Sequence, residues 1–558
     1  MRFRVRRLAS VLVFGFVLAS NTAASAITRW VNDDDPNGGL YVPPGTSCTD
    51  PGYPTIQAAV NAANPTGDTI QVCSGTYTEN VVLNKSVKLL GAQAGMNACG
   101  RTATESIVTP FIATTAILSL QTGSLGSIID GFELFGGAFS STSGHGAIES
   151  FSGPIDGLQI LNNRIRGFTM GSGVFLNNNG INITVNQNEI DGTVKVGNAD
   201  LFHLDTDNFD GFWFTNNCVV NGTTGTGFFV DGNRNVDAGT TGSQTPTAGA
   251  RTPLFSGNVI ENNLTGVNLG RKAWGDGPIT GNTFRNNVFD GLQGGPKNSL
   301  ITLNTFDSNG RHGLALTGFS STSADAGARS NTVTQNCFTG NGFPAGGAGV
   351  FFSASQAVGT ISTNVAQQNN IFGNLTGAQY LGAETINAEF NWWGSPTGPF
   401  HPTNNPSGTG DSVVDNGPLP GGIDFANWLS SPAGSTPCSP PPSGKVTGGG
   451  QVNVLGGIGS FGFNAKQSGG VGSGHLNYLN HFTGAHLDCT VTAVTTLTGT
   501  TAEFSGTCSP NSSSGSFQAH VEDHAEPGKG ADKFIITYGT PAVTEGGTLT
   551  SGNIQIHK

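Results

Sequence analysis

The chain has few charged side chains, and this scarcity excludes several classes of protein. Only 11% of its 558 residues are charged, and only 24 are Lys or Arg. The net charge of −12 disfavours binding to nucleic acid and to anionic lipid. It also disfavours polyanionic sugars, unless calcium or a local basic patch offsets the repulsion.

Long hydrophobic runs are missing after residue 26, so we expect no membrane insertion. The first 26 residues have the pattern of a signal peptide. Four Arg precede an apolar stretch at 8–18, and Ala24-Ser25-Ala26 forms the cleavage site. Without those four Arg the net charge falls to −16. The sequence therefore predicts a secreted protein, released outside the cell or held at its surface.

Helical patterns are also scarce. Gly accounts for 85 residues, and a composition rich in Gly, Asn and Thr suits tight turns and strands. One amphipathic pattern places Ile56, Ala59, Val60 and Ala63 at helical spacing, and Asn64-Pro65 ends it. Strand patterns follow at 69–72, 80–83 and 87–90, whereas residues 27–53 look irregular.

One short pattern recurs from residue 160 to residue 393. It consists of an apolar or small residue, two spacers, an Asn, one spacer and another apolar residue. The repeated Asn are Asn163, Asn188, Asn217, Asn258, Asn282, Asn304, Asn336, Asn369 and Asn391. The steps between them range from 22 to 41 residues, with the shortest at 22 to 25. A constant minimal spacing with occasional longer steps is typical of a solenoid. Each repeat forms one coil, and the longer steps contain loops inserted at a turn.

The repeated Asn predicts a right-handed parallel β-helix. On a strand, an Asn and an apolar residue two positions later face the same way, so the Asn points into the core. A buried Asn needs hydrogen-bond partners, and stacked coils supply them by bringing equivalent Asn into a ladder. The amphipathic helix then covers the open end of the first coil. The alternative is a β-sandwich with unrelated Asn-Gly turns, but that fold gives no fixed same-face pair.

We divide the chain into a signal peptide at 1–26, the β-helix at 27–430, a Pro-rich linker at 431–444 and a small all-β module at 445–558. Eight Cys in an exported chain indicate disulfides. We expect Cys489 to pair with Cys508, and Cys73 to pair with Cys48 or Cys99. Cys218 and Cys337 follow ladder Asn four coils apart, roughly 19 Å, which is too far for a disulfide.

Several motifs resemble a known family. Thr55 to Val60, Gly67-Asp68-Thr69-Ile70 and Gly75 to Val81 are similar to the opening of exported bacterial pectin-lyase-like β-helix proteins. Asn391-Trp392-Trp393-Gly394 is similar to the segment that closes such helices. The resemblance spans roughly 50–400 and implies the fold, because fold alone does not specify activity. The segments 448–450, 474–478 and 526–530 resemble a small module appended to many exported bacterial proteins, which implies a boundary and no chemistry.

The resemblance implies that any enzyme of this type would act on acidic polysaccharide. The paired carboxylates of polygalacturonases and a clear lyase motif are both missing, and Ser143-Gly144-His145-Gly146 is an isolated fragment best interpreted as a surface His. Counting from the ladder Asn instead predicts a column of charges on neighbouring coils. The column contains Asp200, Asp231, Arg271, Lys272 and Lys297, and Asp205, Arg234 and Asp276 fall beside it. The candidate catalytic residues are Asp205, Asp231, Arg271 and Lys272. Solvated, mutually paired surface charges would give the same pattern.

Two further clusters have metal-binding residue types. Asp200, Asp205 and Asp207 offer carboxylates that would suit calcium, although their spacing matches no EF-hand and a solvated acidic loop is the alternative. His520, Glu522 and His524 alternate, so on a strand they share a face and suit zinc, as would any exposed polar strand face.

The leading functional hypothesis is a secreted β-helix protein that binds polysaccharide or a cell-surface glycan, without assured catalysis. The alternative is a lyase, hydrolase or epimerase that acts on acidic polysaccharide through the predicted column. A third hypothesis is a periplasmic accessory protein for metal assembly.

Overall fold

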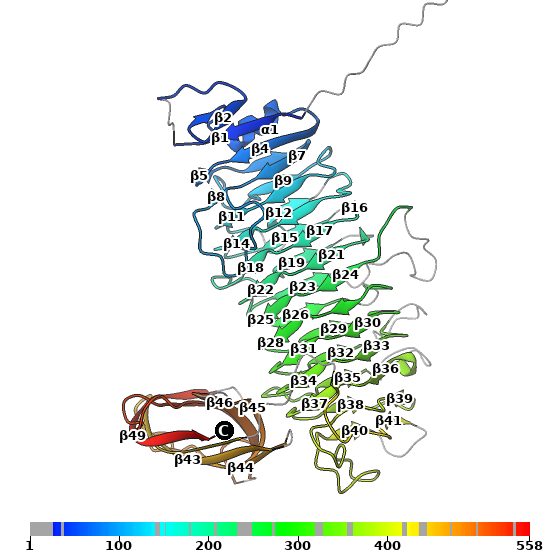
Figure 1. The fold of residues 1–558 in the computed structure, drawn as a ribbon, viewed down its shortest axis with the longest axis vertical. Coiled ribbons are helices and arrows are strands. Elements are labelled where there is room, and N and C mark those ends of the chain that lie inside the picture. Colours follow the sequence, from blue (N-terminus) through cyan, green and yellow to red (C-terminus); the bar gives the residue numbers. More distant parts are fainter. Residues whose placement is uncertain are drawn as a thin grey trace, which may run out of the picture.

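The computed structural model describes residues 26–557, except 35–37, 140–144, 151, 178–179, 206–208, 231–247, 271–273, 318–326, 354–360, 416–420, 435–443, 469–470, 498–499, 510 and 540–542. A long parallel β-helix is followed by a closed antiparallel β-barrel (Figure 1). The predicted fold class is therefore confirmed. Most of the signal peptide and of the Pro-rich linker lies outside the described residues. No helix in the described part of the chain is long and apolar enough to span a membrane.

Three parallel sheets form the walls of the β-helix, and each coil from β4 to β38 contributes one strand to each sheet. Sheet 1 contains β1 (Thr28–Val31), β4 (Thr66–Val72), β7 (Ser86–Leu90), β10 (Ile128–Asp130), β13 (Gln159–Leu161), β17 (Thr184–Asn186), β21 (Trp213–Thr215), β24 (Leu254–Ser256), β27 (Ile279–Thr280), β30 (Leu300–Thr302), β33 (Thr332–Thr334), β36 (Val365–Gln367), β39 (Thr385–Asn387) and β41 (Gly422–Asp424).

Sheet 2 contains β5 (Gly75–Thr78), β8 (Ser106–Thr109), β11 (Phe132–Phe135), β14 (Arg164–Arg166), β18 (Glu189–Asp191), β22 (Cys218–Val220), β25 (Val259–Glu261), β28 (Thr283–Arg285), β31 (Thr305–Asp307), β34 (Cys337–Thr339) and β37 (Asn370–Phe372). Sheet 3 contains β6 (Val81–Leu83), β9 (Leu118–Leu120), β12 (Gly146–Ser150), β15 (Ser172–Leu176), β19 (Phe202–Leu204), β23 (Thr226–Val230), β26 (Thr265–Asn268), β29 (Leu292–Gly294), β32 (Leu314–Leu316), β35 (Val350–Phe352), β38 (Ala378–Tyr380) and β40 (Val413–Asp415).

The predicted helix is present as α1 (Ile56–Ala62), and it covers the first coil. Thr55 caps it, since its side chain accepts a hydrogen bond from the Ala58 N–H. Ile56, Ala59 and Val60 are buried against the strands of that coil. The expectation of an irregular segment at 27–53 is wrong, because β1 pairs with β4 and a small hairpin joins β2 (Gly45–Ser47) to β3 (Asp50–Pro51). The remaining short elements are β16 (Gly180–Ile181), β20 (Phe209–Asp210) and the 3-10 helix Ile361–Thr363.

The predicted Asn ladder is confirmed. All nine Asn are at most 1% exposed, and each of the first eight donates from its Nδ2 and its backbone N–H to the Oδ1 of the next. The ladder Asn lie at the corner between sheets 1 and 2, and not within a strand as the two-residue spacing suggested. The residue before each of them has a positive φ, as at Asn162 (55°) and Leu303 (57°), and this left-handed residue turns the chain.

A second ladder, which we did not predict, follows the corner between sheets 2 and 3. It passes from Asn263 through Asn287, Asn309 and Asn341 to Asn374. The half-buried Asp411 ends it by accepting hydrogen bonds from the Asn374 Nδ2 and backbone N–H and from the Gly373 N–H. Between the ladders, Phe284, Phe306 and Phe338 stack with centroid distances of 4.9 and 4.8 Å.

The C-terminal barrel closes because its first strand pairs with its last. Its strands are β42 (Gly444–Val454), β43 (Gly457–Ser468), β44 (Val471–Asn480), β45 (His486–Leu497), β46 (Thr501–Cys508), β47 (Ser516–Glu522), β48 (Lys533–Tyr538) and β49 (Val543–His557). The predicted Cys489–Cys508 disulfide joins β45 to β46. Figure 1 shows the barrel beside the C-terminal coils of the β-helix.

Candidate functional site

The predicted charge column begins at the ends of neighbouring strands in sheet 3. Asp205 follows β19, Asp231 follows β23, and Arg271 and Lys272 follow β26. These three strands are consecutive neighbours, and Leu204 pairs with Val230. Of the predicted site residues, Asp207, Asp231, Arg271 and Lys272 lie outside the described residues, so the column stays a prediction. Lys297, which we predicted to be part of this surface column, is fully buried and so does not belong to it.

An oriented histidine stands on the outer face of sheet 3, two residues before Asp205. The Nδ1 of His203 lies 2.9 Å from Asp200 Oδ2, and Asp200 Oδ1 accepts a hydrogen bond from the Thr226 N–H. The rings of Phe175 and Phe229, on the two adjacent strands, lie 4.9 and 4.8 Å from the imidazole. A carboxylate that holds one ring nitrogen leaves the other, Nε2, as the proton acceptor.

A buried lysine lies near this pair. Lys195 is 5% exposed, and its Nζ donates to the Gly197 carbonyl oxygen. Burial lowers the pKa of Lys195 to about 8, against the attraction of Asp200. Lys195 was not a sequence candidate, because nothing in its Gly-rich surroundings indicates that the side chain turns inward.

The predicted metal clusters have other partners. Asp200 binds His203 and the Thr226 N–H, and Asp207 lies outside the described residues, so the predicted calcium site stays a prediction. In the barrel, His520 and Glu522 do share a face of β47, but the two Glu522 oxygens bind His520 (3.2 Å), His524 (2.6 Å) and Lys533. These contacts, that of His524 first, lower the pKa of Glu522 to about 2. No group of three His, Cys, Asp or Glu within the described ranges could hold a metal ion.

A second surface was not predicted at all: a segment that crosses the outside of sheet 2. We call residues 91–105 the strap. It begins after β7 and ends before β8. The Cys99–Cys218 disulfide ties it to β22, which is separated from β8 by β11, β14 and β18 in sheet 2. Along the way the Gly100 N–H donates to Glu189 (2.6 Å) and Arg101 donates to the Asn162 carbonyl oxygen (2.9 Å). The strap is therefore fixed to several successive coils.

This disulfide resolves the cysteine alternatives. Cys73 pairs with Cys48, which leaves Cys99 for Cys218. Cys337 is disulfide-bonded as well, and the prediction that it does not pair with Cys218 is confirmed.

Beneath the strap, acidic and basic side chains alternate along sheet 2. Glu133, Arg164 and Glu189 occupy equivalent positions on successive strands. Arg164 lies between the two carboxylates, with N–O distances of 3.4 Å to Glu133 and 3.1 Å to Glu189. Arg166 binds the other Glu133 oxygen at 2.7 Å. Because each carboxylate is paired with an arginine, none is poised for acid–base work.

An open groove of about 580 Å³ lies between the strap and these charges. Its lining includes Thr76, Thr102, Thr104, Glu105, Ile107, Glu133, Arg164 and Arg166. Arg166 is the most accessible cation of the set, with 37% of its side chain exposed, whereas Arg164 is 17% exposed. The Arg166 guanidinium also lies 5.2 Å from the centre of the Phe135 ring, which holds it over the groove. Its Nε is buried and has no hydrogen-bond partner among the described residues.

The comparisons with known proteins agree with this architecture. The sequence profile of the family described as "Right handed beta helix region" matches residues 201–392. No curated protein sequence matches the chain.

Several solved structures are similar in shape. The Dettilon tailspike protein is 12% identical over 95% of this chain and 93% of its own, with a TM-score of 0.42. The pectate lyase Pel9A is 16% identical over 62% of this chain and 79% of its own, with a TM-score of 0.35. The catalytic unit of an α-1,3-glucanase from Streptomyces thermodiastaticus is 13% identical over 67% of this chain and 66% of its own, with a TM-score of 0.34. Because the identities and TM-scores of these three structures are low, the fold of this chain is argued from its own strand pairing alone.

Proposed function

We propose that this protein is exported and binds an acidic polysaccharide in the groove between the strap and sheet 2. The observation that carries the proposal is Arg166, which pairs with Glu133 but keeps 37% of its side chain exposed at an open groove. An acidic protein needs a local basic group to attract a polyanionic chain, and Arg166 with Arg164 supplies it. Export is supported by the signal-peptide pattern and by the disulfides.

The groove offers complementary chemistry to a uronate polymer. The guanidinium of Arg166 has donors suited to a carboxylate. The hydroxyls of Thr76, Thr102 and Thr104 and the carboxylate of Glu105 suit the hydroxyls of adjacent sugars. The disulfide that pins the strap keeps one wall in place before the ligand arrives, which lowers the entropic cost of binding.

The test is Arg166→Ala, with Arg285→Ala as the matched control. Arg285 belongs to the same outer column of sheet 2, is paired with Glu261 and is 47% exposed, but it lies beyond the strap. Affinity electrophoresis on polygalacturonate and on alginate should show binding at least about tenfold weaker for the Arg166 variant, since a hydrogen bond to a charged group contributes about 1.5–3 kcal/mol. Arg285→Ala should bind like the parent protein. Equal affinity of both variants would refute this use of the groove.

A second candidate function is a lyase, hydrolase or epimerase that acts on acidic polysaccharide at the outer face of sheet 3. The His203–Asp200 pair favours it, because an imidazole held by a carboxylate is suited to accept a proton. His203 would act as the base and Asp200 as its positioning residue, next to the predicted Asp205. The column residues Asp231, Arg271 and Lys272 would extend this site.

The enzymatic hypothesis can be checked by release of reducing ends and by absorbance of unsaturated products, on uronate polymers with and without calcium. His203→Gln should abolish activity. His145→Gln is the matched control, because His145 also pairs with a carboxylate, Glu149, at 2.8 Å. Absence of any product from the parent protein, or an unchanged rate in His203→Gln, would eliminate this candidate.

A further inference from the structure

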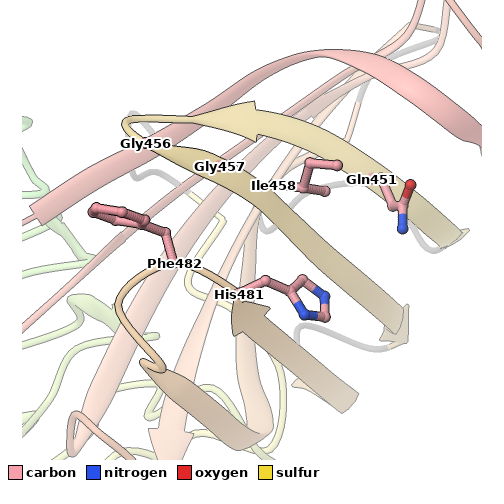
Figure 2. A pocket seen from close by; sticks show the side chains of 6 residues that line it. All are labelled: Gln451, Gly456, Gly457, Ile458, His481 and Phe482. Carbon is pink, nitrogen blue, oxygen red and sulfur yellow. The ribbon is translucent and has the colours of Figure 1, made fainter.

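A hollow of about 430 Å³ lies at one end of the C-terminal barrel (Figure 2). It is bounded by the turn between β42 and β43 and by the turn between β44 and β45. Gln451, Gly456, Gly457, Ile458, His481 and Phe482 line it. The hollow is separate from both surfaces of the β-helix described above.

The aromatic side chain of Phe482 is exposed to solvent on a turn whose backbone is held by hydrogen bonds. It is 66% exposed, although burying a phenylalanine typically contributes about 1.5–3 kcal/mol. The turn is fixed by the fully buried Asn480, whose Oδ1 accepts hydrogen bonds from the Phe482 N–H (2.8 Å) and the Thr483 N–H (3.0 Å). The Asn480 Nδ2 donates to Glu545 at 2.7 Å, so the support continues into the barrel. The backbone that carries the ring is thus held in place before any ligand binds.

Two glycines make room for this ring. Gly456 has a φ of +83°, which favours glycine, and a Cβ there would lie 2.7 Å from the Phe482 ring. A Cβ on Gly457 would lie 3.1 Å from the Cβ of Phe482. Figure 2 shows the Phe482 ring next to this glycine turn, and Ile458, Gln451 and His481 farther from the ring, beyond Gly457.

The two polar side chains of the hollow, His481 and Gln451, are each held by one hydrogen bond. His481 Nε2 lies 2.9 Å from the Ser460 hydroxyl, and this contact orients the imidazole. The other ring nitrogen, Nδ1, is then available to bind a ligand. The Gln451 Oε1 accepts a hydrogen bond from Ser551 at 3.3 Å, so the amide N–H groups of Gln451 can donate to a ligand. None of the six lining residues is Asp, Glu, Lys or Arg.

We infer that this hollow is a second sugar-binding site, which takes a neutral pyranose unit of an oligosaccharide. The apolar face of the sugar ring would lie on Phe482, and its hydroxyls would bind His481 and Gln451. This combination of one apolar surface with a few oriented polar groups is typical of small-ligand sites. An anionic lipid surface would require the basic residues that the lining lacks. A peptide strand would require a free sheet edge, and the closed barrel has none among its described strands.

The test uses the full-length mature chain and saturation-transfer difference NMR with cellotetraose, maltotetraose and laminaritetraose. Phe482→Ala should weaken the binding of at least one of these sugars about tenfold or more. Because Phe482 is exposed, the melting temperature of the Phe482→Ala variant should equal that of the parent protein. Phe482→Trp should retain binding, and His481→Ala should weaken it. The matched control is Leu455→Ala: Leu455 is 93% exposed in the adjacent turn, yet it does not line the hollow.

Three outcomes would overturn the inference. The first is that no sugar in this panel gives a signal with the parent protein. The second is an unchanged signal in Phe482→Ala. The third is that Phe482→Ala and Leu455→Ala abolish the signal equally and also convert a dimer to a monomer in gel filtration, which would identify the patch as a contact between two copies. Because the probes are neutral and the variants lie in the barrel, failure here is independent of the Arg166 result.

Discussion

Replacing one ladder asparagine should destabilise the β-helix far more than its size suggests. The fully buried Asn304 side chain makes four hydrogen bonds. It donates to the Ile279 carbonyl oxygen (2.8 Å) and to Asn336 (3.0 Å), and it accepts from the Asn282 backbone N–H and from the Asn282 Nδ2, both at 2.9 Å. In Asn304→Ala the buried Asn282 N–H loses its acceptor.

The expected cost can be worked from these bonds. An unsatisfied buried donor costs about 1–3 kcal/mol, and each of the other three lost hydrogen bonds contributes about 1 kcal/mol net. Asn304→Ala should therefore lower the free energy of unfolding by about 4–6 kcal/mol, if the ladder relaxes little. A change of this size is unusual for a substitution that removes so few atoms.

Guanidinium unfolding followed by tryptophan fluorescence and circular dichroism provides the measurement. Asn404→Ala is the matched control, because Asn404 is exposed and only its backbone N–H bonds to His401. That variant should lie within about 0.5 kcal/mol of the parent protein. If Asn304→Ala unfolds at the same denaturant concentration as Asn404→Ala, the ladder does not stabilise the fold and this reasoning is wrong.

Three further predictions concern the same rod. Burial raises the pKa of Asp411 to about 6 from 3.8, so its contribution to stability is full below pH 3.8 and is lost as the pH rises through about 6. Asp411→Asn should remove this loss of stability with rising pH. If the melting temperatures of the two proteins change in parallel between pH 4 and pH 7, the pH dependence does not come from Asp411. Replacing Cys99 and Cys218 together with Ser should destabilise the protein by about 2–4 kcal/mol in thermal unfolding and weaken polygalacturonate binding; unchanged binding would show that the strap does not form a wall of the site. Phe306→Ala should cost about 3–5 kcal/mol in guanidinium unfolding, because the ring stacks between two others; a loss below 1 kcal/mol would indicate that the stack collapses to fill the space.

The architecture was accessible from the sequence because its cause is periodic. From β13 to β39 each coil places a hydrogen-bonding amide at the same corner, so the Asn recur, whereas the coils before Asn163 have no such Asn and had to be inferred from other patterns. What the spacing alone did not reveal is the left-handed residue before each Asn, since Asn162 and Leu303 share a backbone conformation and no side-chain chemistry. The second ladder was equally visible, because Asn263, Asn287 and Asn309 each follow a first-ladder Asn by five residues.

The candidate sites were much harder to predict. The Cys99–Cys218 disulfide spans 119 residues, and only the path of the strap across sheet 2 brings the two sulfurs together. The groove at Arg166 depends on the same path. The burial of Lys195 and the pairing of His203 with Asp200 depend on the conformations of individual loops. Loop conformations do not repeat from coil to coil, so no sequence period indicates them. In the barrel, the strand patterns were recognisable, but the presentation of Phe482 depends on the burial of Asn480 against Glu545, a contact across 65 residues.

The helix at the start of the rod has a consequence for behaviour at high concentration. Without α1, the first coil would present three rows of unpaired strand groups, matching in spacing those at the far end of another molecule. Successive molecules would then add end to end, and the product would be a fibre. By closing that face with Ile56, Ala59 and Val60, α1 removes the first coil as a template for such growth.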